Sequence, residues 1–246
     1  MLTDPVIEIL NLNKSFGNNH VLRDFAANLY RNENLVVLGK SGSGKSVLIK
    51  CIIGLLEPDS GTIRVFDEDI SNYDREDLDK MRMKVGFLFQ SNALYDSMTV
   101  RENLEFPLRR HQIRKAQGIS EVSDLVMEAL SNVGLTHTVD MMPSELSGGM
   151  RKRIALARTL ILRPHIILYD EPTTGLDPIT GKEISKLILD VQQKYRASSI
   201  IISHDMNCIN ITSNRVVMLI DGKCYADGSY KFLSETRDPV IREYFE

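Results

Sequence analysis

The segment Gly39–Ser46, which reads GKSGSGKS, constrains this chain more than any other part of it. It follows the apolar run Leu35–Leu38 and leads into a second apolar run, Val47–Ile49. This context predicts a buried strand, a glycine-rich turn and the first turn of a helix. The pattern G-x-x-x-x-G-K-[ST] in that context is typical of a phosphate-binding loop. A chance glycine-rich turn is the alternative, and the strand and helix on either side argue against it.

Each part of this loop has its own task in phosphate binding. The glycines let backbone N–H groups approach phosphate oxygens where a Cβ would intervene, and the following helix adds the unpaired N–H groups of its first turn. Lys45 places a positive charge on the β- and γ-phosphates, and the Ser46 hydroxyl is a suitable ligand for Mg²⁺. The loop therefore predicts binding of a nucleoside triphosphate such as ATP with Mg²⁺. The residues expected at the phosphates are Gly39, Ser41, Gly42, Gly44, Lys45, Ser46 and Val47.

Composition narrows the compartment and the partners. The net charge is −3 and the sequence pI is near 6.0, so no general attraction to nucleic acid is expected. The three cysteines lack metal or redox spacing, which favours buried free thiols in a reducing compartment. No apolar run approaches the ~18 residues of a membrane helix, and Met1–Pro5 does not resemble the start of a secretory signal. We expect a cytoplasmic protein whose membrane function depends on a partner.

The order of apolar patterns predicts an α/β core with an inserted helical subdomain. Strand and helix patterns fill residues 1–90 and 163–237, whereas only helical periodicity is found between about 91 and 162. The expected strands are Val6–Leu12, Val21–Tyr30, Leu35–Leu38, Thr62–Phe66, Val85–Phe89, Ile166–Tyr169, Ser198–Ile202, Arg215–Ile220 and Lys223–Ala226. The expected helices are one after the phosphate loop, Asp74–Met83, Val100–Leu108, Val122–Val133, Arg151–Leu162, Pro178–Lys194 and a short one within Asp238–Glu246.

Two carboxylates end one of the apolar strands. Asp170 and Glu171 follow Ile166–Tyr169, and such a pair is common by chance. In a chain that also has a phosphate loop, the Asp is expected to hold Mg²⁺ through water while the Glu polarises the attacking water. Adjacent residues of a strand point to opposite sides, so both can serve one site only if the chain turns there, and Pro172 makes a turn plausible.

Polar side chains also end two other expected strands. His204 lies at the end of the expected strand Ser198–Ile202, where an imidazole can bridge the γ-phosphate, water and Glu171, although a lone histidine at a strand end is more often structural. Gln90 follows Val85–Phe89 and begins the helical insertion, so it can contact Mg²⁺ and water and sense the state of the nucleotide.

A second anion-binding pattern lies far from the phosphate loop. Ser147, Gly148 and Gly149 precede a long helical run, and a serine cap, free N–H groups and a helix N-terminus together favour an anion. The alternative is a capped helix and nothing more. Since one phosphate loop is already present, a second such feature suggests that two copies of the chain share each nucleotide.

Together these motifs resemble the ATP-binding cassette ATPases over nearly the whole chain. Walker A is Gly39–Ser46, the Q-loop centres on Gln90, the signature is Leu146–Met150, Walker B ends at Asp170-Glu171, the D-loop is Gly175–Asp177 and the switch histidine is His204. The resemblance implies a phosphate-loop NTPase fold with a RecA-like α/β core, an antiparallel β subdomain and a helical subdomain. It implies a homodimer that sandwiches two ATP molecules, with Phe16 stacked on adenine and Asp177 between the subunits.

Finer details resemble one group of cassettes, the MlaF and Mkl type of phospholipid-transport ATPase. They are Met150 in place of the commoner Gln, the segments Phe89–Val100 and Met142–Glu145, and the run Asp177–Thr180. Without the Gln amide, the Ser147 hydroxyl and the helix N-terminus must contact the opposing nucleotide. The resemblance implies a peripheral ATPase on the cytoplasmic face of the inner membrane, with MlaE-like permease subunits and an MCE-type lipid-binding subunit as partners.

Amino-acid or metal importers and lipoprotein-release ATPases share the six motifs and remain alternatives. Non-transport cassettes of DNA repair or translation and ordinary phosphate-loop kinases are more distant ones.

Two surface features leave alternatives open. The tail 238–246 has apolar residues at positions i, i+1, i+4 and i+5 and resembles the Mla-type C-terminus. We expect it to pack on the other subunit, and packing on its own domain is the alternative. The basic residues Arg109, Arg110, His111, Arg114 and Lys115 indicate either a docking patch or a solvated surface.

Overall fold

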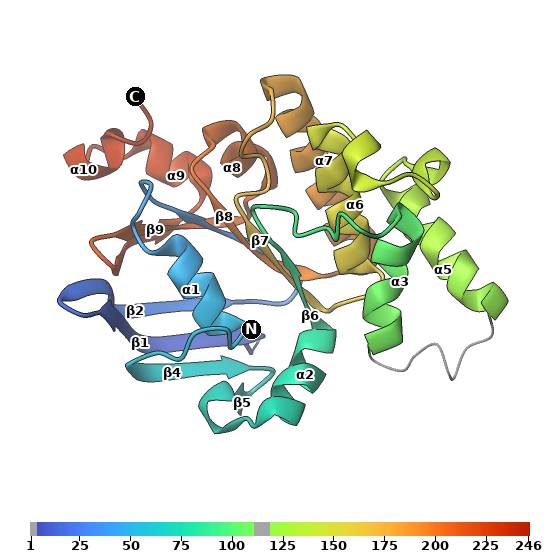
Figure 1. Ribbon diagram of the computed structural model, residues 1–246. Coiled ribbons are helices and arrows are strands. Elements are labelled where there is room, and N and C mark those ends of the chain that lie inside the picture. The colour runs from blue at the N-terminus through green and yellow to red at the C-terminus, as the bar shows by residue number, and fades with distance from the viewer. Residues whose placement is uncertain (1–3, 111–118) are drawn as a thin grey trace.

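Two β-sheets share an apolar core in the computed structural model, which describes residues 4–110 and 119–246. The larger sheet crosses the middle of the molecule, helices cover one of its faces, and the smaller sheet lies beyond the other face (Figure 1). A lobe of helices extends from one side of the larger sheet (Figure 1). The prediction of an α/β core with an antiparallel sheet and a helical insertion is confirmed.

The larger sheet has six strands. Their order is β10 (Lys223–Gly228), β9 (Arg215–Ile220), β3 (Asn34–Leu38), β8 (Ser198–Ser203), β7 (Ile166–Asp170) and β6 (Val85–Leu88). All neighbouring pairs from β9 to β6 are parallel, and β10 pairs antiparallel with β9 through the turn Asp221-Gly222. Both turn residues have positive φ, as a tight hairpin requires. The parallel strands bring the segments that follow β3, β6, β7 and β8 to the same sheet edge.

The smaller sheet is antiparallel. Its order is β2 (Asn19–Leu29), β1 (Ile7–Phe16), β4 (Ser60–Val65) and β5 (Glu68–Asp69). The hairpin of β1 and β2 is longer than the apolar alternation predicts, because both strands continue as far as the turn around Gly17. Register shifts along β1 accompany this extension. The hairpin therefore places Phe16 at its tip.

Helices occupy three places around the sheets (Figure 1). Helices α1 (Lys45–Ile52) and α2 (Arg75–Lys84) lie between the sheets and at their side. The lobe contains α3 (Val100–Arg110), α5 (Ile119–Asn132) and one face of α6 (Gly148–Leu160). The far face of the large sheet carries α7 (Pro178–Tyr195), α8 (Met206–Thr212), α9 (Tyr230–Glu235) and α10 (Pro239–Arg242). Short 3-10 helices span Ile70–Asn72, Thr136–Thr138 and Pro143–Glu145. The sequence patterns did not predict α8, α9 or β5, which are too short for periodicity to reveal.

Strand β3 connects the two main cores because alternate side chains of a strand point to opposite faces. Leu35 and Val37 pack with α1 and the smaller sheet, whereas Val36 and Leu38 pack with α7, α8 and α9. All five residues of β3 are buried, as the uninterrupted apolar run predicts for a central parallel strand. The phosphate loop thus leaves a strand that is fixed from both sides.

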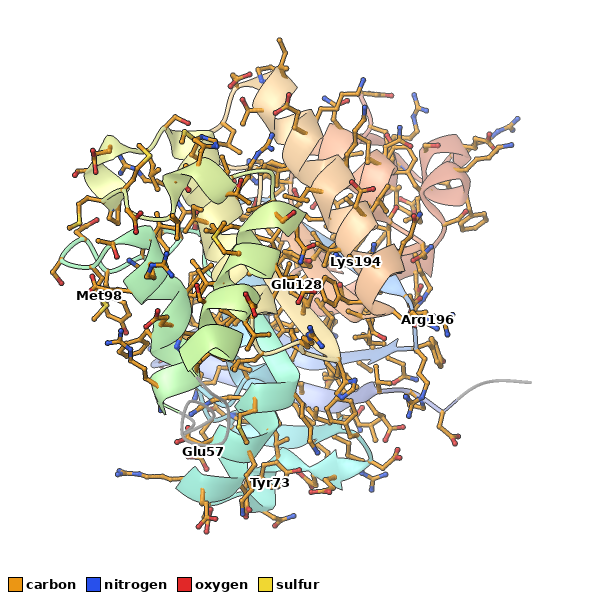
Figure 2. The ribbon with its side chains drawn as sticks, turned by 90° about the vertical axis from the view of Figure 1, so that its right-hand side faces the viewer. Glu57, Tyr73, Met98, Glu128, Lys194 and Arg196 are labelled. Atoms are coloured by element: carbon orange, nitrogen blue, oxygen red, sulfur yellow. The ribbon has the colours of Figure 1, made fainter. Side chains whose placement is uncertain are left out.

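Helix α6 belongs to two cores. Ala155, Leu156 and Leu160 pack against the large sheet, while Ile154 and Ala157 pack inside the helical lobe. Polar contacts reinforce the lobe at its far end, where Lys194 Nζ of α7 donates to Asn132 Oδ1 of α5 at 2.5 Å. Figure 2 shows Lys194 and Glu128 on this side of the molecule. Since α6 is shared, the division of the chain near residues 90 and 162 stays a prediction.

The basic residues at the end of α3 form ion pairs within the chain. Arg109 is 2.7 Å from Glu105, and Arg110 is 3.4 Å from Asp79 of α2. These ion pairs satisfy both arginines within the chain, and the choice between a docking patch and a solvated surface stays a prediction. His111, Arg114 and Lys115 lie outside the described residues.

Cys51 and Cys208 are buried and free, as predicted, and burial raises the pKa of the Cys51 thiol to about 11. Cys224 is free but only half-buried, because it lies on β10 at the edge of the sheet. Within residues 4–110 and 119–246, we find no helix with the length and hydropathy that crossing a membrane would require.

The C-terminal tail packs on its own chain. Ile241 is 6% exposed and joins the core that contains Leu233, and the Phe245 ring contacts the Tyr230 ring edge-on at 5.5 Å. Glu243 pairs with Lys40 of the phosphate loop at 2.9 Å. Ile241 is therefore covered by its own chain, because α9 supplies the surface on which it rests, and contact of the tail with the other subunit stays a prediction.

We expect Ile241→Ala to lower the free energy of unfolding by about 2–4 kcal/mol, since it removes a buried branched side chain. The measurement is chemical unfolding at several protein concentrations, with the half-exposed Val240→Ala as the matched control. Packing within the chain makes the loss independent of protein concentration. A loss that disappears in dilute protein would instead mean that the tail stabilises a dimer.

Candidate functional site

The phosphate loop is held in shape by its glycines and by a buried lysine. Gly44 has φ of +103°, and a Cβ there would come within 2.8 Å of Val21 Cγ1 on β2. Only glycine combines that backbone conformation with that close approach. Lys45 is 6% exposed, and its Nζ donates to the carbonyl oxygens of Gly39 at 2.7 Å and Lys40 at 3.0 Å. Two of its three donors are thus used inside the loop, and one remains for a ligand.

Burial lowers the pKa of Lys45, and the nearby carboxylates of Glu171 and Asp170 oppose that shift. The Nζ of Lys45 is 3.7 Å from Glu171 Oε1. The ammonium group is therefore balanced by the Walker B carboxylates, and it remains a local positive charge at the floor of the loop.

The parallel strands bring the predicted polar residues together. Asp170 is the last residue of β7, His204 directly follows β8, and Gln90 lies two residues after β6. Since β3, β8, β7 and β6 are successive neighbours, these residues and the phosphate loop meet at one sheet edge.

Ser46 and Asp170 form a direct contact across 124 residues of sequence. Ser46 Oγ donates to Asp170 Oδ1 at 3.0 Å. Asp170 is 5% exposed, and this burial raises the pKa of its carboxyl group, while the hydrogen bond from Ser46 acts in the opposite direction. A hydroxyl and a carboxylate oxygen at this spacing are hard oxygen donors of the kind that Mg²⁺ prefers.

Glu171 turns out of the strand through its own backbone. Its φ is +50°, a left-handed conformation that is uncommon for a residue other than glycine. The side chain accepts from Thr174 Oγ1 at 3.1 Å, and its Oε2 lies 2.8 Å from His204 Nδ1. The turn that the sequence suggested at Pro172 is thus already made at Glu171, and it lets both carboxylates serve one site.

These residues line a pocket of about 340 Å³. Its lining residues are Phe16, Val21, Ser41, Gly42, Gly44, Lys45, Ser46, Val47, Gln90, Glu171 and His204. Every one of them except Val21 was predicted from the sequence. Gly39 and Asp170 do not line the pocket, but each contacts a residue that does. Gly39 accepts from Lys45 and Asp170 accepts from Ser46. Phe16, which is 49% exposed, forms one wall from the tip of the hairpin of β1 and β2.

The remaining predicted residues lie elsewhere on the surface. Ser147 caps α6 by accepting from the backbone N–H of Met150 at 3.3 Å, and Asp177 caps α7 by accepting from the N–H groups of Ile179 and Thr180. A hydrogen bond from the Thr180 hydroxyl is the main cause that lowers the pKa of Asp177. None of Ser147, Gly148, Gly149 and Asp177 lines the pocket.

The two helix N-termini form one continuous surface. An ideal Cβ on Gly149 would lie 2.7 Å from Thr180 Cγ2, so α6 and α7 begin in contact. Ile179 beside them is 75% exposed, which is unusual for an isoleucine. The chain therefore presents a phosphate pocket and, apart from it, a second group of helix N-termini.

Sequence reasoning missed residues that support the site from α6. Lys152 is 2% exposed and donates to the Gln90 carbonyl oxygen at 2.9 Å, and Arg158 donates to the carbonyl oxygens of Asn92 and Ala93. A signal was present for one of them, because Lys152 shares the helical stripe of the apolar Ala155 and Leu156. A lysine on a buried stripe requires a partner.

The chain matches known proteins over most of its length. The family described as "ABC transporter" matches residues 22–174. The Mycobacterium leprae (strain TN) protein called "Probable ribonucleotide transport ATP-binding protein mkl" is 40% identical over 97% of this chain and 68% of its own length. The Arabidopsis thaliana protein TRIGALACTOSYLDIACYLGLYCEROL 3, chloroplastic, is 34% identical over 98% of this chain and 74% of its own length. Methionine import ATP-binding protein MetN 1 of Acinetobacter baylyi is also 34% identical, over 97% and 67% respectively.

Solved structures share the fold. The ATP-binding cassette MJ0796, in a dimeric post-hydrolysis state with ADP and Pi, superposes with a TM-score of 0.81 at 30% identity. That match covers 91% of this chain and 98% of the cassette. Together with the pocket and its motifs, these likenesses have one meaning: the chain belongs to the ABC transporter family, as an ATP-binding subunit that hydrolyses ATP.

Proposed function

We propose that two copies of this chain enclose two ATP molecules, each held by the phosphate loop of one copy and by Ser147, Gly148 and Gly149 of the other. The observation that carries this proposal is the separation of the two anion-binding features. Ser147, Gly148 and Gly149 are exposed or half-exposed and lie outside their own chain's pocket. Cassettes of this family form dimers, and the MJ0796 cassette is a dimer. The exposed Ile179 and the cap Asp177 would then lie between the copies.

The donor set of the pocket fits Mg²⁺. Ser46 and Asp170 supply adjacent oxygens, and Gln90 lines the same pocket. In the part of the chain that the structure describes, no group of three or more His, Cys, Asp or Glu side chains is placed to hold a metal ion. This pattern suits Mg²⁺, which is commonly held by one or two protein oxygens together with phosphates and water. When bound, Mg²⁺ would neutralise charge on the phosphate oxygens.

We assign Glu171 as the residue that orients and polarises the attacking water. Its carboxylate lines the pocket and faces Lys45, which stabilises charge on the transferring phosphoryl group. His204 holds the carboxylate through its Nδ1 contact of 2.8 Å and lines the pocket itself, so it can position the water against the γ-phosphate. Gln90, which lines the same pocket, would contact bound Mg²⁺ and water and so report nucleotide occupancy to the segment behind it.

Phe16 is proposed to stack on adenine. We expect Phe16→Ala to weaken nucleotide binding by about 1–3 kcal/mol, which is about 5- to 150-fold in Kd, because a base loses its aromatic partner. Calorimetric titration with ADP measures the change, and Phe16→Tyr, which keeps the ring face, is the matched control. Unaltered ADP affinity in Phe16→Ala would remove Phe16 from the site.

We propose a second cavity as the docking place for the permease subunit. It has a volume of about 520 Å³ and lies between α2 and β6 of the core and α3 and α6 of the lobe. Phe87, Phe89 and Tyr95 line it, so it is aromatic and continuous with the segment after Gln90. A groove with aromatic walls and with Asp79, Arg82, Arg110 and Arg158 along it suits a short helix of a membrane partner, and movement of the lobe would change its width.

We propose phospholipid as the cargo, in an Mla-type system at the cytoplasmic face of the inner membrane. The support is Met150, the segment after Gln90, and the likeness to a chloroplast protein whose name contains a lipid. The partners in that system are two MlaE-like permease subunits and an MCE-type lipid-binding subunit. The names of the Mkl protein and of MetN 1 refer to ribonucleotide transport and methionine import, which makes an importer of small solutes the second candidate.

Reconstitution distinguishes these cargoes. The complex is purified in detergent with its permease, its subunits are identified by mass spectrometry, and it is placed in proteoliposomes with labelled phospholipid or with labelled methionine or ribonucleotide. ATP-dependent movement of phospholipid, absent from a Glu171→Gln complex, would support the proposal. ATP-dependent movement of methionine or ribonucleotide would overturn the lipid assignment and leave the ATPase assignment intact. Recovery of the chain on ribosomes would overturn the transport assignment.

A further inference from the structure

Lys152 is a buried cation next to the nucleotide pocket. It lies in the first turns of α6 and is 2% exposed, and its Nζ donates to the backbone carbonyl oxygen of Gln90 at 2.9 Å. Burial lowers the pKa of this ammonium group, and the charges of Asp170 and Glu171 oppose the shift. A lysine in such a place is costly unless its donors are used, so its contact with Gln90 calls for a reason beyond packing.

The backbone that Lys152 holds is strained. Asn92 and Ala93, just after Gln90, both have positive φ, of +65° and +50°. Two consecutive residues other than glycine in that region persist only where neighbouring groups hold them. The Asn92 side-chain oxygen is also buried, with no hydrogen-bond partner in the described part of the chain. The segment 90–93 therefore does not keep its shape through its own local preferences.

Arg158 holds the same segment from further along α6. Its guanidinium donates to the Ala93 carbonyl oxygen at 2.8 Å and to the Asn92 carbonyl oxygen at 3.1 Å. It also lies over the Tyr95 ring, 5.9 Å from the centroid. Lys152 and Arg158, both on α6, thus bind the carbonyl groups of Gln90, Asn92 and Ala93 in one strained segment.

We propose that Lys152 and Arg158 are positioning residues for ATP hydrolysis, which fix segment 90–93 to α6 so that Gln90 keeps its place in the pocket. The geometry has a consequence for the dimer, which rests on the function proposed above. Ser147 caps α6 and Lys152 lies in its first turns, so one helix links the signature for the opposite ATP to the backbone of Gln90 at its own ATP. Closure of the dimer brings the signature against one nucleotide, and it would then fix the position of Gln90 beside the other nucleotide.

The test compares variants of Lys152 in the full-length chain. Lys152→Met keeps a long side chain and loses the donor, and we expect kcat for ATP hydrolysis to fall about tenfold or more while ADP affinity stays within about twofold. Lys152→Gln keeps a neutral donor and should restore part of kcat. Lys186→Met, an exposed lysine on α7, is the control that should behave as the parent. Thermal unfolding verifies that each variant is folded. If Lys152→Met does not fold, Arg158→Gln takes its place in the comparison.

A double-mutant cycle with Gln90→Ala decides whether the effect passes through Gln90. We expect Lys152→Met to cost little further activity once the Gln90 side chain is gone. The positioning role alone would be overturned by either of two results. In the first, the losses in kcat of the two single variants add fully in the double variant; in the second, Lys152→Met keeps the parental kcat while Gln90→Ala is impaired. Parental kcat in Gln90→Ala would overturn it together with the role proposed for Gln90. ADP affinity that falls in parallel with kcat would show that Lys152 merely supports the pocket.

Discussion

Replacing Glu171 by glutamine is expected to reduce kcat for ATP hydrolysis by about 10²- to 10⁴-fold while ATP binding and ATP-driven dimer formation persist. The carboxylate that would accept a proton from water is removed, and an amide of the same shape keeps an oxygen for the Thr174 hydroxyl. Loss of one negative charge beside Lys45, 3.7 Å away, also reduces repulsion of the triphosphate. Phosphate release at saturating ATP and size-exclusion chromatography with ATP are the measurements.

The control for this variant is Glu235→Gln on α9, where the glutamate is exposed and lies 4.0 Å from Lys231. It changes the net charge equally and should hydrolyse ATP at the parental rate. If Glu171→Gln also hydrolyses ATP at the parental rate, the assignment of Glu171 is wrong. If it loses ATP binding as well, Glu171 acts in the architecture of the pocket and not in the chemical step.

Lys45→Met should weaken ATP binding about 10- to 100-fold and reduce kcat by a further factor of about 10² or more. Its ammonium group is held at the floor of the loop by the Gly39 and Lys40 carbonyl groups, so a phosphate oxygen meets a charge that is already positioned. Methionine fills the space without that charge. Calorimetric titration with ADP gives the loss in affinity, and phosphate release at saturating ATP gives the loss in rate.

Lys45→Arg is the informative companion. A planar guanidinium requires more room than the 6% exposed site offers, and it presents its donors differently, so arginine should fail to restore hydrolysis. Exposed Lys186→Met controls for loss of a lysine. Parental affinity and rate in Lys45→Met would exclude the phosphate loop as the catalytic nucleotide site.

Local sequence was sufficient for the nucleotide pocket because its parts are short and stereotyped. A glycine-rich loop between a strand and a helix, and polar residues directly after apolar strands, predict their own conformations. Parallel strands bring their ends to one edge, so the strand pattern alone predicts that Lys45, Asp170, Gln90 and His204 lie together, and the observed strand order agrees. The sequence also predicts that the signature at Ser147 is a second anion-binding feature, apart from this pocket.

Contacts between distant segments could not be predicted in the same way. The Ser46–Asp170 hydrogen bond joins residues 124 apart, and Val21 enters the pocket only because β2 passes over Gly44. The apolar spacing of the tail and its resemblance to the Mla-type C-terminus predict contact with a partner, whereas α9, on which Ile241 rests, has only six residues and leaves no periodic signal.

The sequence by itself determined the family, the fold class and nearly all the residues that line the pocket. The tertiary structure alone decided how the strand end turns at Glu171, what Lys152 and Arg158 hold, and where the tail packs. The physical reason is the range of the interactions. Periodicity and turn preferences act over a few residues, whereas a strained backbone or a buried charge is stable only through partners that the folded chain brings to it.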